Sequence, residues 1–191
     1  KVIVQSGAGL PSGYADHEYS EAGAQISNSA KEVFESNIVL KVEPPTEQEL
    51  HYFKPNTTLL STVQLSSLTP EYIQNINKKR VNAVAFEFIE DKGGLKPIVR
   101  SMSEIAGVCI TSIAGEYLSK SQEGQGIIFG GVTGVPPAKV VIIGAGTIGE
   151  NVARIARSLG AEVQVYDYHH YKLRRLKKDL NDQIYTSIID N

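Results

Sequence analysis

The sequence has little sulfur and no tryptophan: its 191 residues include one cysteine and one methionine. A single cysteine, Cys109, excludes an intramolecular disulfide framework and fits a reducing, cytoplasmic environment. Because no histidine lies near Cys109 in the sequence, we expect it to be buried by packing rather than to act as a nucleophile. The chain also lacks the paired Cys and His spacings of a structural metal site, so we expect no metal.

The sequence also has no large excess of either charge and no long apolar run. Lys and Arg total 19 against 21 Asp and Glu, which gives a formal net charge of −2. Such a balance lacks the basic footprint of nucleic-acid binding. No segment approaches the roughly 20 apolar residues of a membrane span. We therefore expect neither nucleic acid nor a membrane among the partners of this chain.

One stretch carries most of the functional information. The apolar run 139–143 leads into a G-x-G-x-x-G turn at residues 144–149, and an amphipathic stretch follows. Gly160 stops that stretch before a second apolar run, which ends at Asp167. A strand, a glycine-rich turn, a helix and a second strand ending in an acid form the fingerprint of a dinucleotide-binding βαβ unit. The alternative is a βαβ unit that has tight turns and binds no ligand.

Each glycine of the fingerprint has its own predicted task. Gly144 turns the chain off the strand, Gly146 leaves room for a pyrophosphate, and Gly149 lets the helix pack close to the strand. The phosphates would bind free N–H groups at the start of the helix, where Thr147 and Ile148 lie. The turn is therefore the predicted phosphate site of a bound NAD.

The end of the second apolar run is predicted to bind the adenosine half. Asp167 would accept hydrogen bonds from the ribose hydroxyls, and its charge would favour NAD(H) over NADP(H). Tyr168 and His169 follow where residues often flank the adenine. The basic run 172–178 is interpreted as the solvated face of a helix. Asp167 has an alternative interpretation as a turn residue at the end of a strand.

Residues 1 to about 100 alternate short apolar runs with amphipathic ones, which is typical of an α/β fold with a mostly parallel sheet. We expect strands at residues 2–5, 38–42, 58–63 and 81–88. Capping patterns predict helix starts at Ser29, Thr46, Thr69 and Ser101, and the last of these helices would run to about residue 120.

The predicted architecture is α/β, with two Rossmann-like parallel-sheet domains flanking a cleft and incomplete at both ends. Residues 1–120 would form the substrate domain, and the loop 121–137, rich in glycine and closed by two prolines, would form the hinge. Residues 138–191 would begin the NAD(H)-binding domain. The chain starts within a strand and stops after a third apolar run at residues 184–189, so we expect a fragment.

Several blocks of this sequence resemble the alanine dehydrogenase family, which shares its fold with the NAD(H)-binding subunit of proton-pumping transhydrogenase. The main blocks are residues 101–107 and 130–140, and shorter ones at 6–9, 22–24 and 38–42 fall in matching order. The glycine-proline block before residue 139 is more similar to the dehydrogenase branch. The resemblance implies NAD as cofactor, oxidative deamination of L-alanine or a related 2-amino acid to a 2-oxo acid, and a homo-oligomer.

Two positions depart from the family pattern. Where the resemblance places a substrate-binding lysine the chain has Glu43, and where it places an acid–base histidine the chain has Gln64. A carboxylate would repel the substrate carboxylate, and an amide cannot exchange a proton near neutral pH. Met102 and Ser103 match residues near the nicotinamide. Lys41 points to the same strand face as Glu43, which makes it the candidate that would offset the charge of Glu43 and present an ammonium of its own.

Three functions fit these features. The first is an NAD-dependent amino-acid dehydrogenase with an altered substrate pocket, which the family blocks favour. The second is a transhydrogenase-like or regulatory module that binds NAD(H) and handles no amino acid, which Glu43 and Gln64 favour. The third is a dehydrogenase for another 2-amino acid, as in saccharopine-type relatives. In each case we expect L-alanine to be oxidised poorly or not at all.

Overall fold

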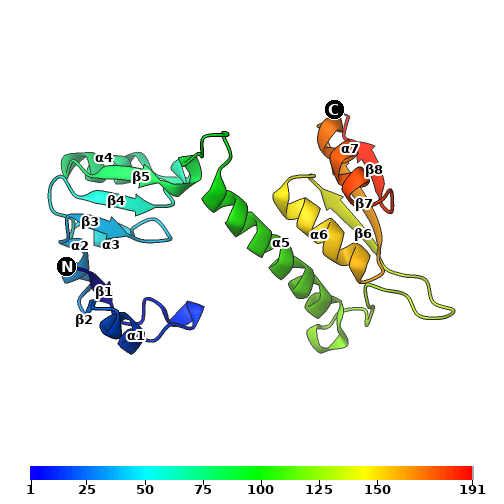
Figure 1. The fold of residues 1–191 in the computed structure, drawn as a ribbon, viewed down its shortest axis with the longest axis horizontal. Coiled ribbons are helices and arrows are strands. Elements are labelled where there is room, and N and C mark those ends of the chain that lie inside the picture. Colours follow the sequence, from blue (N-terminus) through cyan, green and yellow to red (C-terminus); the bar gives the residue numbers. More distant parts are fainter. Residues whose placement is uncertain (191) are drawn as a thin grey trace. The chain divides into compact units, whose positions relative to one another are not determined.

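The computed structural model describes residues 1–190, which divide into two compact units (Figure 1). The first unit runs from Lys1 to Lys96 and the second begins at Pro97. Every pairing between the named strands of either unit is parallel. The predicted α/β class with parallel sheets is confirmed.

The first unit holds two small sheets. One pairs β1 (Ile3–Gln5) with β2 (Gln25–Ser27), and the other has the order β3 (Ile38–Leu40), β4 (Thr58–Ser61), β5 (Asn82–Ala85). Strand β2 was not expected from the sequence. The helical elements of this unit are η1 (Leu10–Ser12), α1 (Asp16–Glu21), α2 (Ala30–Phe34), α3 (Glu47–Leu50), η2 (Leu65–Ser67), α4 (Pro70–Lys78) and η3 (Phe86–Phe88).

Local capping chemistry starts three of these helices at the predicted residues. The side chain of Ser29 accepts the backbone N–H of Glu32 at the start of α2. Thr46 begins α3 with a reciprocal capping box, and Thr69 precedes the first-turn Pro70 of α4. The helices and strands enclose a buried core of Phe34, Val39, Leu50, Phe53, Leu59 and Tyr72.

The second unit contains a three-stranded sheet in the order β6, β7, β8. Its elements are α5 (Pro97–Leu118), η4 (Lys120–Gln122), β6 (Lys139–Ile143), α6 (Thr147–Ser158), β7 (Glu162–Asp167), α7 (His170–Asp179) and β8 (Tyr185–Ile188). Ile143 at the end of β6 pairs with Tyr166 of β7, which brings the residues after both strands to one edge of the sheet. The buried residues Ala153, Val163, Val165 and Leu176 form the centre of the core.

Helix α5 differs from its prediction in two ways. It begins at Pro97 rather than at Ser101, whose hydroxyl donates to the carbonyl of Pro97 inside the helix. Cys109 is exposed within this chain, so its predicted burial is wrong. The physical reason is that α5 packs on α6 at Gly107, where a Cβ would lie 2.6 Å from the Cβ of Asn151, and Cys109 lies outside that contact.

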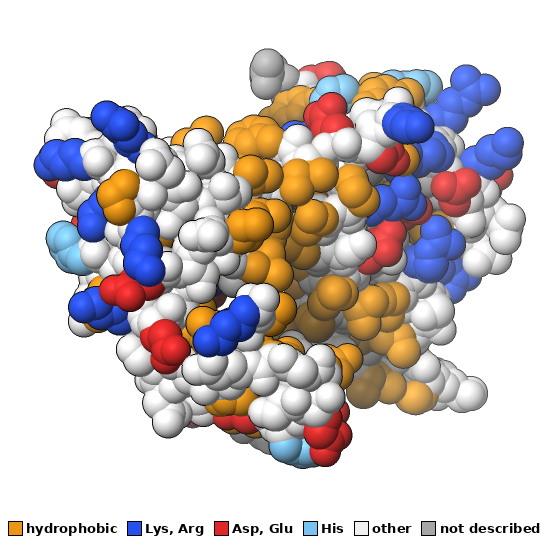
Figure 2. Space-filling model, turned by 60° about the vertical axis from the view of Figure 1, so that its left-hand side comes forward, with side chains coloured by type: hydrophobic (Ala, Val, Ile, Leu, Met, Phe, Trp, Pro, Cys, Tyr) orange, Lys and Arg blue, Asp and Glu red, His pale blue; other side chains and the backbone are white. Residues whose placement is uncertain are grey.

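This packing against α6 places α5 in the second unit. The loop 121–137, predicted as a hinge, therefore lies within that unit, and its role as a hinge stays a prediction. By length and composition alone α5 could cross a membrane, and most of its apolar window is exposed. It also carries Arg100, Glu104 and Glu116, and a single helix of this kind is weak evidence for a span. Figure 2 shows apolar side chains exposed on the visible face.

Candidate nucleotide-binding site

The glycine-rich turn after β6 has three glycines with three different environments. Gly144 has a φ of +106°, a backbone conformation that side chains rarely adopt. A Cβ on Gly149 would collide with the carbonyl oxygen of Gly144, so the helix can approach the strand only without a side chain there. A Cβ on Gly146 would meet nothing within 4 Å. The first and third glycines are thus required by the protein itself, and the second faces open space.

Helix α6 begins at this turn with its first N–H groups free of any side-chain cap. Gly146 is the N-cap residue and provides no capping side chain, although its carbonyl accepts the N–H of Glu150 at 2.8 Å. The N–H groups of Thr147, Ile148 and Gly149 belong to the first turn, where an α-helix has no internal acceptors. Open space beside uncapped N–H groups fits a phosphate of NAD.

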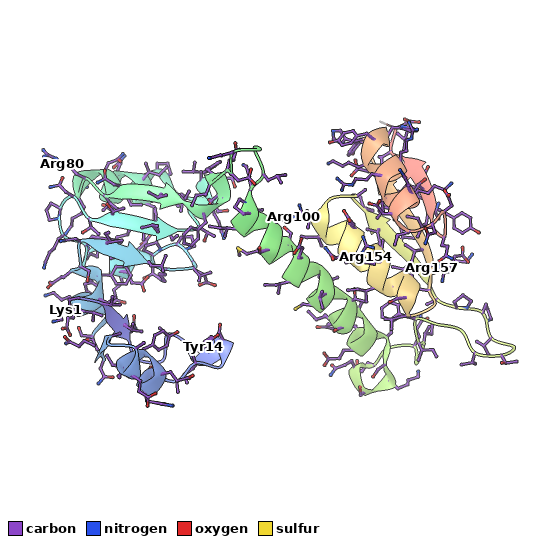
Figure 3. The ribbon with its side chains drawn as sticks, viewed as in Figure 1. Lys1, Tyr14, Arg80, Arg100, Arg154 and Arg157 are labelled. Carbon is purple, nitrogen blue, oxygen red and sulfur yellow. The ribbon has the colours of Figure 1, made fainter. Side chains whose placement is uncertain are left out.

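Two arginines form ion pairs with Glu150, which lies in the first turn of α6. Glu150 accepts a hydrogen bond from Arg154 at 3.2 Å and another from Arg175 of α7 at 3.0 Å. Arg154 projects from α6 in Figure 3. Because both guanidinium groups are permanently charged, they reduce the repulsion that Glu150 would exert on a phosphate nearby. The contact from Arg175 also connects α7 to the start of α6.

Asp167 lies at the end of β7 beside the turn, and its side chain is 8% exposed. Its Oδ2 accepts the backbone N–H of Ala145 at 2.7 Å, and its Oδ1 accepts the backbone N–H of His169 at 2.7 Å. Burial would raise the pKa of Asp167, but these backbone hydrogen bonds hold it below its ordinary value. The group is therefore held as a carboxylate, the form that a ribose hydroxyl would need as an acceptor.

The two residues after Asp167 are exposed. Tyr168 is 63% exposed and makes no side-chain hydrogen bond within residues 1–190. His169 instead turns its ring back, with Nδ1 3.0 Å from Oδ1 of Asp167. The same ring lies edge-to-face on Tyr171, with 5.7 Å between ring centroids. Of the two adenine-flanking candidates, only His169 contacts the predicted ribose acid.

The substrate-binding candidates of the first unit lie at the carboxyl edge of its larger sheet. Glu43 follows β3 and Gln64 follows β4, and these strands pair in parallel. The N–H and hydroxyl of Thr62 both donate to the carbonyl of Val42, which ties the two loops together. Both candidate side chains are exposed and have no hydrogen bond or ion pair in the described part of the chain. The structure therefore brings these two positions to one edge.

Gln64 is held by a residue that sequence reasoning missed. The carboxylate of Glu87 accepts the backbone N–H of Gln64 at 2.7 Å and that of Val63 at 2.9 Å. Partial burial would raise the pKa of Glu87, but hydrogen bonds to the backbone of Glu87 itself, Gln64 and Val63 keep it below its ordinary value. Gln64 itself has a φ of +50°, which is uncommon for a residue with a side chain. The only sequence signal for this contact is an acid just after the next strand.

Lys41, the candidate to offset the charge of Glu43, pairs with Glu49 instead. Its ammonium lies 2.7 Å from Oε2 of Glu49, which also accepts the N–H of Thr46 in the capping box of α3. Nearby, the hydroxyl of Tyr72 donates to the carbonyl of Pro45 at 2.6 Å. Burial, together with the charge of Glu49, raises the pKa of Tyr72 to about 12. Lys41 thus stabilises this loop through Glu49, and the carboxylate of Glu43 has no ion-pair partner within residues 1–190.

Met102 and Ser103 lie on α5 in the second unit. Met102 is exposed, and Ser103 is partly buried. The structure places these residues and the edge that carries Glu43 and Gln64 in different units. Their predicted contacts with nicotinamide or substrate stay predictions, as do the roles of the other candidate residues.

Comparison with known proteins identifies the family. The sequence profile described as "Alanine dehydrogenase/PNT, N-terminal domain" matches residues 1–106, and the corresponding C-terminal profile matches residues 111–191. The chain therefore belongs to the alanine dehydrogenase/PNT family, which confirms the resemblance inferred from its sequence blocks.

Individual relatives agree with this assignment. Alanine dehydrogenase of Bacillus subtilis is 38% identical over 188 residues, which is 98% of this chain and 49% of the relative. That of Methanococcus maripaludis is 36% identical over 192 residues, 100% of this chain and 51% of the relative. The chain thus spans about half the length of these relatives.

Two solved structures support the fold. An L-alanine dehydrogenase matches all of this chain with a TM-score of 0.89 and 31% identity, and 52% of that chain is covered. A transhydrogenase from Sinorhizobium meliloti matches all of this chain with a TM-score of 0.79 at 23% identity, and 53% of it is covered. At that identity the second likeness shows a shared fold alone.

Proposed function

We propose that this chain supplies the substrate domain, residues 1–120, and the first part of the NAD(H)-binding domain, residues 138–191, of an NAD-dependent amino-acid dehydrogenase. The observation that carries the proposal is the environment of Gly146. A glycine with no steric neighbour stands beside the uncapped start of α6, which is the space that a pyrophosphate would fill. Membership of the alanine dehydrogenase/PNT family supports the dehydrogenase class.

The chain's own residues would bind and orient the reactants. The turn at Gly144, Gly146 and Gly149, with the N–H groups of Thr147 and Ile148, would hold the phosphates of NAD. Asp167 would accept hydrogen bonds from the hydroxyls of the adenosine ribose, and Tyr168 would flank the adenine. Met102 and Ser103 would contact nicotinamide or substrate. When bound, NAD+ would supply the hydride acceptor. Loss of a hydride from the α-carbon and of a proton from the nitrogen would convert the substrate to a 2-imino acid, and water would hydrolyse this to a 2-oxo acid and ammonium.

The substrate pocket differs from the family pattern at Glu43 and Gln64. The charge of Glu43 is not offset by Lys41, which is paired with Glu49. An unpaired carboxylate at this edge favours a substrate with an additional cationic group over L-alanine. We therefore propose a related 2-amino acid, with a basic side chain or an amine-linked product, as the substrate. We also propose a cytoplasmic homo-oligomer, as expected from the family resemblance and the single cysteine.

A substrate panel tests this proposal. Full-length protein would be supplied with NAD+ and, in turn, L-alanine, L-lysine, L-ornithine, L-glutamate and saccharopine, while NADH formation is followed by absorbance. The proposal predicts turnover of a basic or amine-linked member that exceeds turnover of L-alanine. L-alanine as the best substrate would contradict the altered pocket.

The second candidate function is a transhydrogenase-like module that binds NAD(H) and handles no amino acid. The two substitutions at positions 43 and 64 favour it, because a module of this kind needs no amino-acid pocket. Binding of NADH without oxidation of any 2-amino acid in the panel would support this function instead.

A further inference from the structure

The protein itself occupies most of the acceptor positions on Asp167. Oδ2 accepts one hydrogen bond, from the N–H of Ala145. Oδ1 accepts the N–H of His169 at 2.7 Å and lies 3.0 Å from Nδ1 of the same residue. Because each carboxylate oxygen has about two lone-pair positions, Oδ1 is fully used and Oδ2 has one position left.

Few contacts hold the ring of His169 in this arrangement. A carboxylate only accepts, so the Nδ1 that faces Asp167 must carry a hydrogen. The His169 side chain is 56% exposed, and its ring also approaches Tyr171 edge to face. Its backbone N–H would keep its own bond to Oδ1 if the ring turned away. The ring can therefore leave Asp167 without loss of the turn.

The adenosine ribose of NAD(H) carries neighbouring 2′ and 3′ hydroxyls, which are two donors. A carboxylate that accepts both needs two free acceptor positions, and Asp167 offers only one, on Oδ2, while the ring is in place. We propose that the imidazole of His169 competes with the adenosine ribose for Oδ1 of Asp167 and so limits the affinity of the site for NAD(H). This inference rests on the proposed NAD(H) site.

It follows that NAD(H) binding releases the Nδ1–H of His169 from the carboxylate. Two variants of the full-length protein test this. His169→Ala removes the ring, and His169→Phe keeps an aromatic ring beside Tyr171 but removes the donor. His170→Ala is the matched control, because His170 is an exposed neighbour whose side chain does not bond to Asp167. Thermal unfolding of each variant would verify that it is folded.

Affinity would be measured by fluorescence or calorimetric titration with NADH, with ADP-ribose and with reduced nicotinamide mononucleotide, which lacks the adenosine ribose. Removal of a competing charge-assisted bond at an exposed site should tighten binding by about threefold to tenfold. We expect that gain in affinity for NADH and for ADP-ribose in both His169 variants. The affinity of these variants for the mononucleotide should not change, and His170→Ala should bind all three ligands as the unmodified protein does. In the unmodified protein, NADH should change the nitrogen NMR shift of the His169 Nδ1.

Each other result counts against the inference. Unchanged or weaker binding of NADH by the two His169 variants would overturn it, because the ring would then be neutral or would support Asp167. An equal gain with the mononucleotide would overturn it too, since the ribose would not be involved. Failure of the unmodified protein to bind NADH or ADP-ribose would overturn the proposed nucleotide site, and this inference with it. The two kinds of failure are thus distinguishable.

Discussion

The backbone N–H of Ala145 donates to Oδ2 of Asp167 at 2.7 Å, and this bond joins the end of β7 to the glycine-rich turn after β6. One carboxylate thereby fixes the shape of the predicted phosphate site and marks the predicted ribose site. A change at Asp167 should consequently affect both the stability of the second unit and its choice of cofactor.

The first prediction concerns acid stability. The pKa of Asp167 is lower in the fold than its ordinary value of 3.8. A carboxyl of this kind contributes stability that is fully present above its unfolded pKa and is lost as the pH falls through the lowered folded value. Asp167→Asn should therefore lower stability near neutral pH by about 1–2 kcal/mol. It should also flatten the loss of stability below about pH 4.

Denaturant unfolding of both proteins at a series of pH values would check this. If the free energy of unfolding falls equally steeply at acid pH in the unmodified protein and in Asp167→Asn, then Asp167 does not cause the loss of stability in acid. Glu162→Gln is a suitable control, since Glu162 is exposed at the other end of β7 and makes no recorded side-chain bond.

The second prediction separates two glycines of one turn. Gly149→Ala should reduce the melting temperature, because its Cβ would collide with the carbonyl oxygen of Gly144. Gly146→Ala should leave the melting temperature nearly unchanged, because its φ of −81° suits alanine and the space around it is open. It should nevertheless weaken NADH binding, because the methyl group would enter the space assigned to the pyrophosphate.

Calorimetric melting and NADH titration on both variants would provide the comparison. Undiminished NADH affinity in Gly146→Ala would show that the open space beside α6 is not the phosphate site, whatever the stability of Gly149→Ala.

The third prediction concerns the loop that presents residue 64. Oε1 of Glu87 accepts the N–H groups of both Val63 and Gln64, and Oε2 lies 3.2 Å from the Val63 nitrogen. Glu87→Gln keeps one acceptor oxygen but removes the second one and the negative charge that strengthens these bonds. We expect a loss of about 1 kcal/mol in stability and faster exchange of the two amide hydrogens. Hydrogen-exchange measurements would detect this, with the exposed Glu90 changed to Gln as the control.

The fourth prediction concerns the substrate pocket. Two like charges about 4 Å apart repel by roughly 4 kcal/mol at an effective dielectric near 20, and loss of an acid–base histidine removes about 10²–10⁴-fold in rate. Glu43→Lys combined with Gln64→His should therefore raise L-alanine oxidation by at least about 10²-fold. NAD+ reduction by full-length protein would measure it. Robust oxidation of L-alanine by the unmodified protein would contradict the prediction.

How far the sequence predicted the fold depends on the range of the interactions involved. The caps at Ser29, Thr46 and Thr69 were predictable because each is made by residues a few positions apart. The strand–turn–helix at residues 139–149 was predictable for the same reason. The burial expected for Cys109 was wrong because α5 packs on α6 at Gly107, a contact between two helices that the local sequence does not specify.

The side-chain partners within the site were less predictable. Lys41 and Glu43 share a strand face, yet the ammonium pairs with Glu49, which the capping box of α3 holds in place. The bond from the Gln64 N–H to Glu87 joins segments that follow two different strands, β4 and β5, and no local pattern specifies it. The position of Asp167 followed from the fingerprint, but its bonds to Ala145 and His169 depend on the folded turn.

The measurement that tests the central claim most directly is a titration of the full-length protein with NADH and, separately, with NADPH under identical salt and pH. Because Asp167 is held as a carboxylate beside the turn, NADH should bind more tightly than NADPH. Asp167→Ser should reduce the difference between the two affinities. Tighter binding of NADPH by the unmodified protein, or saturable binding of neither cofactor, would contradict the assignment of residues 139–167 as an NAD(H) site.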